Sequence, residues 1–143
     1  MGNRQFVTFR IDGHLMGIDI AHVREINRFL DITDVPRTPS HVLGLINLRG
    51  QTVTVFDLGL RMGLAPRRIT GESHNVIFKR ENVGLLVDCI GDVVAVAEAA
   101  VDCPPANLNG LNAELVEAVV SMDKELLVVL SPEKLLAPAA KVV

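Results

Sequence analysis

The feature that most constrains this chain is a succession of short strand-like segments divided by turn residues. Phe6–Ile11 and Leu15–Ile20 flank Asp12-Gly13-His14, a good hairpin turn, and a second hairpin is predicted from His74–Lys79 and Val83–Asp88. The whole pattern predicts about eight or nine short strands with one or two short helices, which is typical of β-barrels or a β-sandwich. Because no run of helices alternates with the strands, a doubly wound α/β sheet is excluded.

The remaining strand-like segments lie in the second half of the chain, and one earlier segment is ambiguous. Leu115–Met122 and Glu125–Leu130 are predicted to form a hairpin. Cys89–Val101 is strand-like but interrupted at Gly91-Asp92. Ala21–Phe29 suits either a helical turn or a strand, since its apolar residues fit both periods.

The hairpin around Arg49-Gly50 is the most informative segment. If these two residues form the turn, with Gly50 supplying the positive φ that such turns need, Ile46 faces Val53 and Gly44 faces Val55. These residues then share one side of the hairpin with Leu48. The opposite side carries Leu45, Asn47, Thr52 and Thr54. Because the apolar and polar sets mostly separate, this register predicts a half-buried hairpin.

Two short helices are predicted, and each has its own signal. Gly59–Leu64 precedes Ala65-Pro66, which ends it. Ser131 is a capping hydroxyl before the second helix, Glu133–Ala137. Asp57 ends an apolar strand, as the phosphorylated aspartate of response-regulator receivers does, but the helices that such receivers need are missing. We therefore expect Asp57 to cap the helix that follows it.

Composition and charge exclude several classes of function. The 143 residues are 49% hydrophobic and 22% charged, which indicates a globular domain rather than a disordered chain. With 14 basic against 17 acidic residues, no Trp and no Tyr, the chain lacks the basic groove and stacking aromatics of a single-stranded nucleic-acid binder. No apolar run is long enough to span a membrane, and two cysteines are too few for a disulfide scaffold. We expect a cytoplasmic protein with no nucleic-acid partner and no direct membrane insertion.

The sequence shows no residues that would carry catalysis. It contains neither a phosphate-binding glycine pattern nor a CxxC motif, and its four histidines have no paired spacing. The adjacent Ser40 and His41 would point apart on an extended chain, so they are interpreted as surface polar residues. We therefore expect no enzymatic activity, no cofactor and no metal site. What remains is a small β protein suited to binding other proteins.

An ordered set of motifs runs through most of the chain. It consists of Val23-Arg24-Glu25-Ile26, Asp34-Val35-Pro36-Arg37-Thr38-Pro39, Gly44-Leu45-Ile46-Asn47-Leu48-Arg49-Gly50, Val53-Thr54-Val55-Phe56-Asp57-Leu58 and Val83-Gly84-Leu85-Leu86-Val87-Asp88. In order and spacing, from about Phe6 to Leu136, this set resembles the CheW family of chemotaxis coupling proteins. A short piece such as Asn-Leu-Arg-Gly would be weak evidence alone, whereas the ordered set is strong.

The resemblance implies a mostly all-β fold of two small SH3-like five-stranded β-barrels sharing a hydrophobic centre, with one or two short helices. It implies a non-enzymatic adaptor that couples the cytoplasmic tips of methyl-accepting chemoreceptors to the regulatory domain of the histidine kinase CheA. The receptor tip would lie in a groove between the barrels. The kinase domain, which has the same fold, would pack barrel to barrel with the adaptor, so that ring or array assembly beneath membrane receptor arrays is possible.

The resemblance also sets the expected domain limits. A single CheW-like domain would cover residues 5–137, with a C-terminal tail at 138–143. The approximate split between the two barrels is expected near residues 66–74. Strands from the chain ends are allowed to complete the barrel of the other half.

The resemblance suggests a receptor or kinase interface at the residues of these motifs. The expected interface residues are Val23, Glu25, Ile26, Gly44, Asn47, Arg49, Leu85 and Val87. Arg49 resembles the receptor-contact arginine of the family, although a solvated turn residue is the alternative. Glu25 would pair either with a basic group of the partner or internally, with Arg49 or Arg28.

For the other residues, structural roles compete with contact. Gly44 and Gly50 are expected to serve backbone geometry before binding. Asn47 would face outward and either bond to a partner or cap its own turn. Leu85 and Val87 would line a groove only if their side chains point out of the core, and Val93, Val94 and Val96 raise the same question.

Two alternative functions stay open. One is a small-ligand or enzymatic β-barrel with a pocket between the barrels, which would show converging polar groups in a concave site. The other is a coupling-like scaffold in a signalling system other than chemotaxis.

Overall fold

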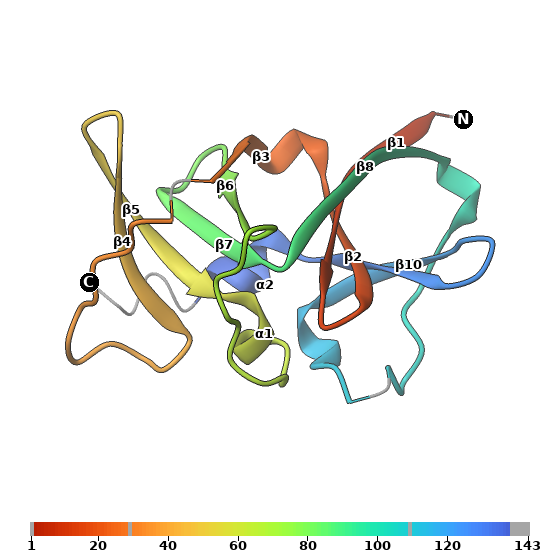
Figure 1. Ribbon diagram of the computed structural model, residues 1–143. Helices are drawn as coiled ribbons and strands as arrows, with labels where there is room; N and C mark the ends of the chain where they lie inside the picture. The colour runs from red at the N-terminus through yellow and green to blue at the C-terminus, as the bar shows by residue number, and fades with distance from the viewer. Residues whose placement is uncertain (1, 29, 109, 138–143) are drawn as a thin grey trace.

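Two β-sheets make up the computed structural model, which describes residues 2–28, 30–108 and 110–137 (Figure 1). The six-stranded sheet has the order β8 (Cys89–Ala97), β1 (Asn3–Ile11), β2 (His14–Asp19), β11 (Leu126–Leu130), β10 (Val116–Ser121) and β9 (Val101–Asp102). The five-stranded sheet has the order β3 (Val23–Asn27), β6 (His74–Phe78), β7 (Val83–Val87), β5 (Gln51–Asp57) and β4 (Val42–Leu48). The predicted mostly-β fold in two parts is therefore confirmed. The predicted tail at 138–143 and Phe29 lie outside the described residues.

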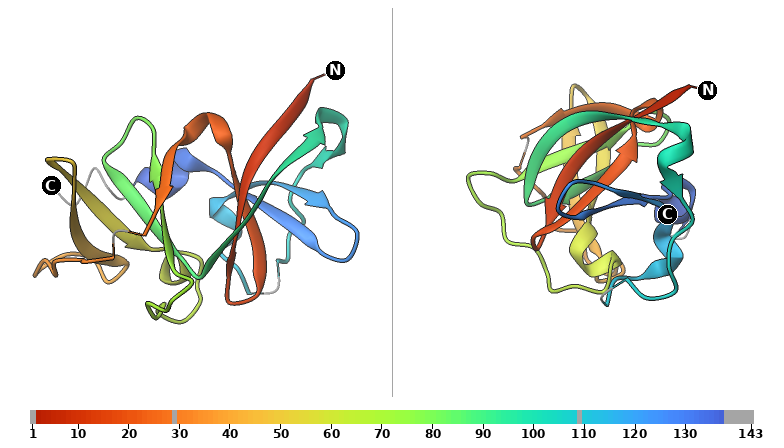
Figure 2. Two further views of the ribbon diagram at one scale, coloured as in Figure 1. Left: turned by 45° about the horizontal axis from the view of Figure 1, so that its top comes forward. Right: turned by 90° about the vertical axis from the view of Figure 1, so that its right-hand side faces the viewer.

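Helices are short and few. Two are α-helical, α1 (Leu58–Arg61) and α2 (Pro132–Leu136), and three are single 3-10 turns, η1 (Ile20–His22), η2 (Glu98–Ala100) and η3 (Ala113–Leu115). Figures 1 and 2 show the five-stranded sheet beside the six-stranded sheet, with α2 returning toward the middle of the molecule.

The chain passes between the sheets twice. Strands β1 and β2 belong to the six-stranded sheet, β3 to β7 to the five-stranded sheet, and β8 to β11 again to the six-stranded sheet. Both ends of the described chain thus complete one sheet. The expected split near residues 66–74 falls within the five-stranded sheet, because β5 before it and β6 after it are both members.

The buried apolar side chains form three clusters. The largest lies between the sheets and combines residues of both, such as Phe9 and Ile18 from one and Phe78 and Leu85 from the other. A second cluster, around Val55, fills the five-stranded half, and a third fills the six-stranded half. Each sheet therefore has its own core, and the two share a hydrophobic centre, which is the dominant stabilising term for a domain of this size.

The β4–β5 hairpin has the predicted register. Ile46 pairs with Val53 and Gly44 with Val55, while Ile46, Leu48, Val53 and Val55 all pack in the core of the five-stranded half. The turn goes beyond the expectation, because Arg49 as well as Gly50 has a positive φ, at 51° and 85°. The β1–β2 turn has the same character, with φ of 52° at Asp12 and 83° at Gly13. Two consecutive positive φ values are those of a type I′ turn, whose twist matches that of the flanking strands.

Both helix caps form as predicted. Asp57 is fully buried, and its Oδ1 accepts a hydrogen bond from Leu60 N at 3.1 Å while its Oδ2 accepts one from Arg67 N at 2.8 Å. Ser131 Oγ likewise accepts from Lys134 N at 3.4 Å. The first helix is shorter than the predicted Gly59–Leu64, since it ends at Arg61. Gly63, with φ of 84°, explains the early end, because a left-handed glycine after the last turn terminates a helix.

Two strand predictions need correction. Strand β8 is continuous through Gly91-Asp92, where an interruption was expected. Those two residues face the single residue Thr8, so the sequence signal marks a β-bulge instead of a break. The ambiguous Ala21–Phe29 segment contains both structures, a 3-10 turn and then β3, and with the two-residue β9 this brings the strands among the described residues to eleven.

Candidate functional site

An ion pair between Arg49 and Glu25 forms the centre of the candidate site. Arg49 Nη1 donates to Glu25 Oε1 at 2.6 Å, and Nη2 donates to Oε2 at 3.2 Å, so the guanidinium grips the carboxylate with two parallel bonds. Glu25 lies on edge strand β3. Arg49 lies in the turn that connects the other edge strand, β4, to β5. The pair therefore joins the two edges of the five-stranded sheet.

Exposure differs sharply between the two partners. The Arg49 side chain is 68% exposed, whereas that of Glu25 is 22% exposed. Hydrogen bonds from Arg49 and then from Asn27 lower the pKa of Glu25, and the carboxylate raises the pKa of Arg49 in return. Glu25 is thus held in its charged form, and it orients an arginine whose remaining N–H groups face the solvent.

The backbone also fixes the tip. Asn47 Oδ1 accepts a hydrogen bond from Gly50 N at 3.0 Å, so this exposed residue caps its own turn, one of the two roles expected for it. Arg49 occupies the left-handed region, which residues with a β-carbon adopt only at a cost. Strained residues of this kind are concentrated at functional sites.

A recess of about 250 Å³ lies beside the ion pair and is lined by Arg24, Glu25, Leu48, Arg49 and Gln51. Arg24 is the extra residue of a bulge in β3, because Val23 pairs with Phe78 and Glu25 pairs with Ile77. Its Nη1 donates to Gln51 Oε1 at 3.4 Å, but its Nε and Nη2 are buried without a hydrogen-bond partner in the described part of the chain. Buried donors of this kind normally bond to protein or to ordered water.

Sequence reasoning passed over Arg24, although it lies inside the first motif. The only signal available was its position between Val23 and Glu25. A bulge re-aims a side chain, and nothing in the apolar pattern of a five-residue strand reveals one.

The apolar residues around Glu25 are half-buried. Val23 and Ile26 both pack against the cluster between the sheets. Gly44 is buried, and a β-carbon there would collide with the backbone carbonyl of Thr33, which bridges to Leu45. The missing side chain of Gly44 therefore makes room for the Thr33 backbone of the same protein, not for a partner helix.

Leu85 and Val87 cannot line an exposed groove. Both side chains are fully buried in the cluster between the sheets, since β7 is a central strand covered on both faces. An unbroken apolar run is what such a strand requires. The expectation that these two residues form part of an interface is therefore corrected by their burial, whereas Glu25, Asn47 and Arg49 reach the surface.

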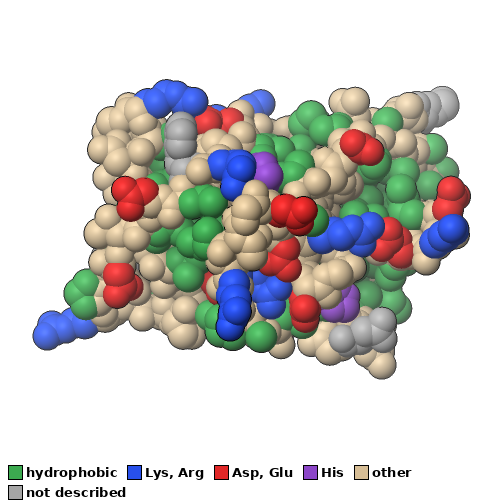
Figure 3. Space-filling model, viewed as in Figure 1, with side chains coloured by type: hydrophobic (Ala, Val, Ile, Leu, Met, Phe, Trp, Pro, Cys, Tyr) green, Lys and Arg blue, Asp and Glu red, His purple; other side chains and the backbone are tan. Residues whose placement is uncertain are grey.

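Other apolar side chains are exposed instead. Val93 on β8 is 50% exposed and Ile20 in η1 is 39% exposed, while Val94 and Val96 pack on the core of the six-stranded half. Figure 3 shows hydrophobic side chains in several separate patches on one face, divided by charged residues. Because side chains alternate along β8, Val94 and Val96 point toward the core and Val93 points toward solvent.

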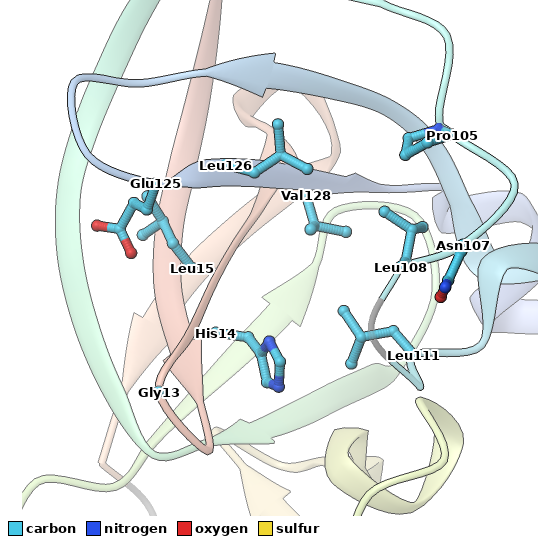
Figure 4. Close-up of a pocket in the computed structure, with 10 residues that line it drawn as sticks. All are labelled: Gly13, His14, Leu15, Pro105, Asn107, Leu108, Leu111, Glu125, Leu126 and Val128. Carbon is cyan, nitrogen blue, oxygen red and sulfur yellow. The ribbon is translucent and has the colours of Figure 1, made fainter.

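A second recess, of about 270 Å³, lies in the six-stranded half (Figure 4). Leu15, Leu126, Leu108 and Leu111 supply much of its wall. Of its polar residues, Glu125 is engaged by Arg10 through two bonds of 2.8 and 2.7 Å. Its volume is slightly below the usual range for ligand sites, and its wall combines apolar side chains with His14, Asn107 and Glu125.

The described residues contain neither a membrane-spanning helix nor a cluster of metal-binding side chains. No helix there is long and apolar enough to cross a membrane. Within the same residues, no three His, Cys, Asp or Glu side chains gather as they would around a metal ion.

Comparison with known proteins assigns the chain to a family. The model of the family described as "CheW-like domain" matches residues 5–140. A probable chemotaxis protein CheW of Rhizobium etli is 31% identical over 94% of this chain and 88% of its own length, and the chemotaxis protein CheW of Treponema pallidum is 35% identical over 92% and 81%. The crystal structure of the scaffolding protein TtCheW from Thermoanaerobacter tengcongensis superposes with a TM-score of 0.83 at 29% identity, covering 92% of this chain and 90% of that one. The chain belongs to the CheW-like family.

Proposed function

We propose that this CheW-family chain, a chemotaxis coupling adaptor, holds the cytoplasmic tip of a methyl-accepting chemoreceptor through the Arg49 tip of its five-stranded sheet. The observation that carries this proposal is the Arg49–Glu25 geometry: an arginine largely open to solvent, in a strained backbone conformation, with its guanidinium already oriented by a carboxylate. Preorganisation of this kind removes part of the entropy cost of binding.

The arrangement favours an acidic or carbonyl-rich partner surface. Arg49 has free N–H groups, and the neighbouring Arg24 has two buried donors without an acceptor in the described part of the chain. Receptor carboxylates or carbonyls placed here would accept hydrogen bonds from the exposed Arg49 guanidinium, and the positive charge of Arg24 would favour the same acidic groups. Exposed apolar side chains lie elsewhere, at Val93 on β8 and Ile20 in η1.

The mechanism is geometric and needs no chemistry. The adaptor would hold the receptor on one surface and the regulatory domain of the kinase CheA on another, so that receptor and kinase are kept at a fixed distance and orientation. Such an adaptor works in the cytoplasm and is recruited to receptor arrays at the membrane. Because adaptor and kinase domain share a fold, repeated contacts between them would extend into rings or arrays.

Calorimetric titration tests this proposal. The purified protein is titrated with a receptor cytoplasmic fragment and, separately, with the CheA regulatory domain from the same cell. We expect saturable binding to both, and we expect Arg49→Ala to weaken receptor binding at least tenfold while kinase binding and melting temperature stay within error. A uniform loss of receptor binding, kinase binding and stability would instead assign Arg49 a structural role. Absence of binding to either partner would remove the proposed function.

A further inference from the structure

The two hairpins that precede the helices are copies of one another. Val42 pairs with Phe56 and Val116 with Leu130, so the residue numbers differ by 74 in both strands. Each pairing then shifts by one residue at the same place, between Val42 and Gly44 in one hairpin and between Val116 and Ala118 in the other. Chance does not place a bulge at matching positions in two unrelated hairpins.

The match continues through the helix caps. Asp57 and Ser131, again 74 residues apart, are the two N-caps, and they accept hydrogen bonds from Leu60 N and Lys134 N. Their own N–H groups donate to His41 O at 2.7 Å and to Leu115 O at 2.8 Å. Strand, bulge, strand and capped helix therefore repeat as one unit.

The preceding hairpins, β1–β2 and β6–β7, also correspond. Each one pairs in parallel with the last strand of a copied hairpin: Met16-Gly17 of β2 lies against Val128-Val129 of β11, and Val83-Gly84 of β7 lies against Thr54-Val55 of β5. Gly17 and Gly84 occupy the same position in the two parallel pairs.

The edge strands β3 and β8 complete the correspondence. Val23 pairs with Phe78, and Ile90 pairs with Phe9, after which both pairings are offset by a bulge. Glu25 and Asp92 then follow at equivalent positions. The chain therefore consists of two tandem units, residues 3–61 and 74–136, which have the same order of strands and a capped helix at the end, apart from the two-residue β9 that only the second contains.

The two units have exchanged strands. Unit 1 (residues 3–61) contributes β1 and β2 to the six-stranded sheet and β3, β4 and β5 to the five-stranded sheet. Unit 2 (residues 74–136) contributes β6 and β7 to the five-stranded sheet and β8 to β11 to the six-stranded sheet. Of the nine strand pairings among the described residues, four join one unit to the other: β1–β8, β2–β11, β3–β6 and β5–β7. Strands β3 and β8 have no pairing within their own unit.

We infer that the surface each unit presents to the other can equally be supplied by a second copy of this chain, which would close into an intertwined dimer. In such a dimer, unit 1 of one copy pairs with unit 2 of the other, and every strand register described above is kept. Exchange of identical elements between chains is a low-cost route to dimers, because no new interface has to be created. Glu25 and Arg49 both belong to unit 1, so each half of the dimer would carry an intact candidate site.

The link between the units is suited to act as the hinge. Arg67 is held by Asp57 and by Asp88, to whose Oδ2 its Nη1 donates at 2.9 Å. The residues after it, Arg68 to Glu72, are all exposed, and Ile69 is 51% exposed. Opening the link within these five residues leaves the buried Met62 and Ser73 in place, and it breaks the hydrogen bonds that join Thr70 to Ser73.

Complementation between two full-length variants tests this inference. Phe9 and Phe78 are equivalent buried residues, one in each unit, and burying a carboxylate at either position would unfold the chain. Phe9→Asp and Phe78→Asp chains are refolded separately and as an equimolar mixture. We expect the mixture to regain the native circular dichroism signal at least fivefold above the mean of the separate samples, in a species of twice the 15.5 kDa chain mass by light scattering.

A mixture of Phe9→Asp and Ile18→Asp chains is the matched control, since both substitutions lie in unit 1 and leave no intact copy of it. Recovery in the first mixture alone supports the inference. Equal recovery in both mixtures, or recovery in neither, overturns it.

Cleavage of the otherwise unaltered chain gives a second test that depends on no core substitution. A protease recognition sequence is inserted between Thr70 and Gly71, and the folded protein is cut, unfolded in denaturant and diluted. Two complementary units should reassemble with the original thermal transition. The same insertion between Pro104 and Pro105 divides unit 2, and the cut protein should not reassemble. Failure to reassemble after the first cut, or equal reassembly after both cuts, overturns the inference.

Discussion

The β1–β2 and β4–β5 hairpins end in turns of the same backbone geometry but opposite chemistry. Asp12-Gly13 and Arg49-Gly50 have nearly identical φ angles. Aspartate is among the residues that tolerate the left-handed conformation best, because its short polar side chain bonds locally, whereas arginine has no such advantage. The first turn is explained by local conformational preference, and the second is not.

The difference separates a turn made for stability from a turn that presents a side chain. At Asp12 the backbone N–H donates to Asp88 Oδ2 at 2.7 Å, which anchors the turn to the body of the molecule. At Arg49 the anchoring is done by the side chain, through Glu25, and most of that side chain remains open to solvent. A strained tip that holds an oriented, accessible cation is what a binding surface requires.

The largest effect is expected when the base of the β4–β5 hairpin is changed. Gly44→Ala should reduce the free energy of unfolding by about 3 kcal/mol or more, because the new β-carbon meets the fixed backbone carbonyl of Thr33 at a positive φ. Gly13→Ala is the matched change in the other hairpin, where a β-carbon meets nothing within 4 Å. It should cost only about 1–2 kcal/mol for the conformation itself. Urea unfolding measures both, and equal losses would contradict the steric explanation.

A charge swap at the tip tests what the ion pair presents. The double change Glu25→Arg with Arg49→Glu allows an ion pair of reversed orientation, so the melting temperature should stay near that of the original protein. Receptor binding should nevertheless fall at least tenfold, since the exposed end of the pair is now an acid. Arg80→Glu, an exposed turn residue elsewhere, is a control for a local reversal of charge at a turn. Full receptor binding by the swapped protein would show that Arg49 only closes the sheet.

Exchanging turn chemistry between the tips should change stability in opposite directions. Arg49→Asn places a residue that tolerates the left-handed region in the strained turn, and should raise the melting temperature by about 3 °C while receptor binding is lost. Asp12→Arg should lower the melting temperature by a similar amount without affecting receptor binding. Thermal unfolding followed by circular dichroism, together with titration, distinguishes the two. A lower melting temperature for Arg49→Asn would mean that the Glu25 contact outweighs the backbone strain.

The smallest effect is a shift in titration. The pKa of Glu25 is lowered in the folded protein, so this carboxylate stabilises the fold above its ordinary pKa and loses that contribution as the pH falls through the folded value. Arg49→Gln should raise the pKa of Glu25 toward its ordinary value, as carboxyl NMR titration would show. Glu125, whose pKa is lowered by Arg10, should not change. An unchanged Glu25 would mean that Asn27 alone accounts for its lowered pKa.

Local chemistry made much of the structure predictable from the sequence. The register of the β4–β5 hairpin followed from apolar alternation around Arg49-Gly50, and the two helix caps followed from Asp57 and Ser131. Glu25, Asn47 and Arg49 reach the surface because turn tips and edge strands are exposed by construction.

Features that depend on contacts between segments far apart in the sequence could not be predicted from local patterns. Leu85 and Val87 lie on a strand whose covering on both faces is set by the other sheet, so their burial could not be read from alternation. The expected split near residues 66–74 illustrates the same point. Chain order separates two units there, but the pairing of β3 with β6 places the boundary between the sheets elsewhere.

Strand exchange also has a consequence for the protein during its synthesis. Met16 pairs with Val128, so the β1–β2 hairpin leaves the ribosome long before β11, the strand that pairs with β2 in the six-stranded sheet. Phe6, which is fully buried in the folded protein, packs in one cluster with Leu127 and Val129 of β11, so its cover is incomplete until that strand has been synthesised. Contacts this far apart in sequence form slowly and leave apolar strands open to aggregation. The six-stranded sheet therefore cannot be completed until β11 has been synthesised, and the yield in the cell depends on what protects the β1–β2 hairpin in the interval.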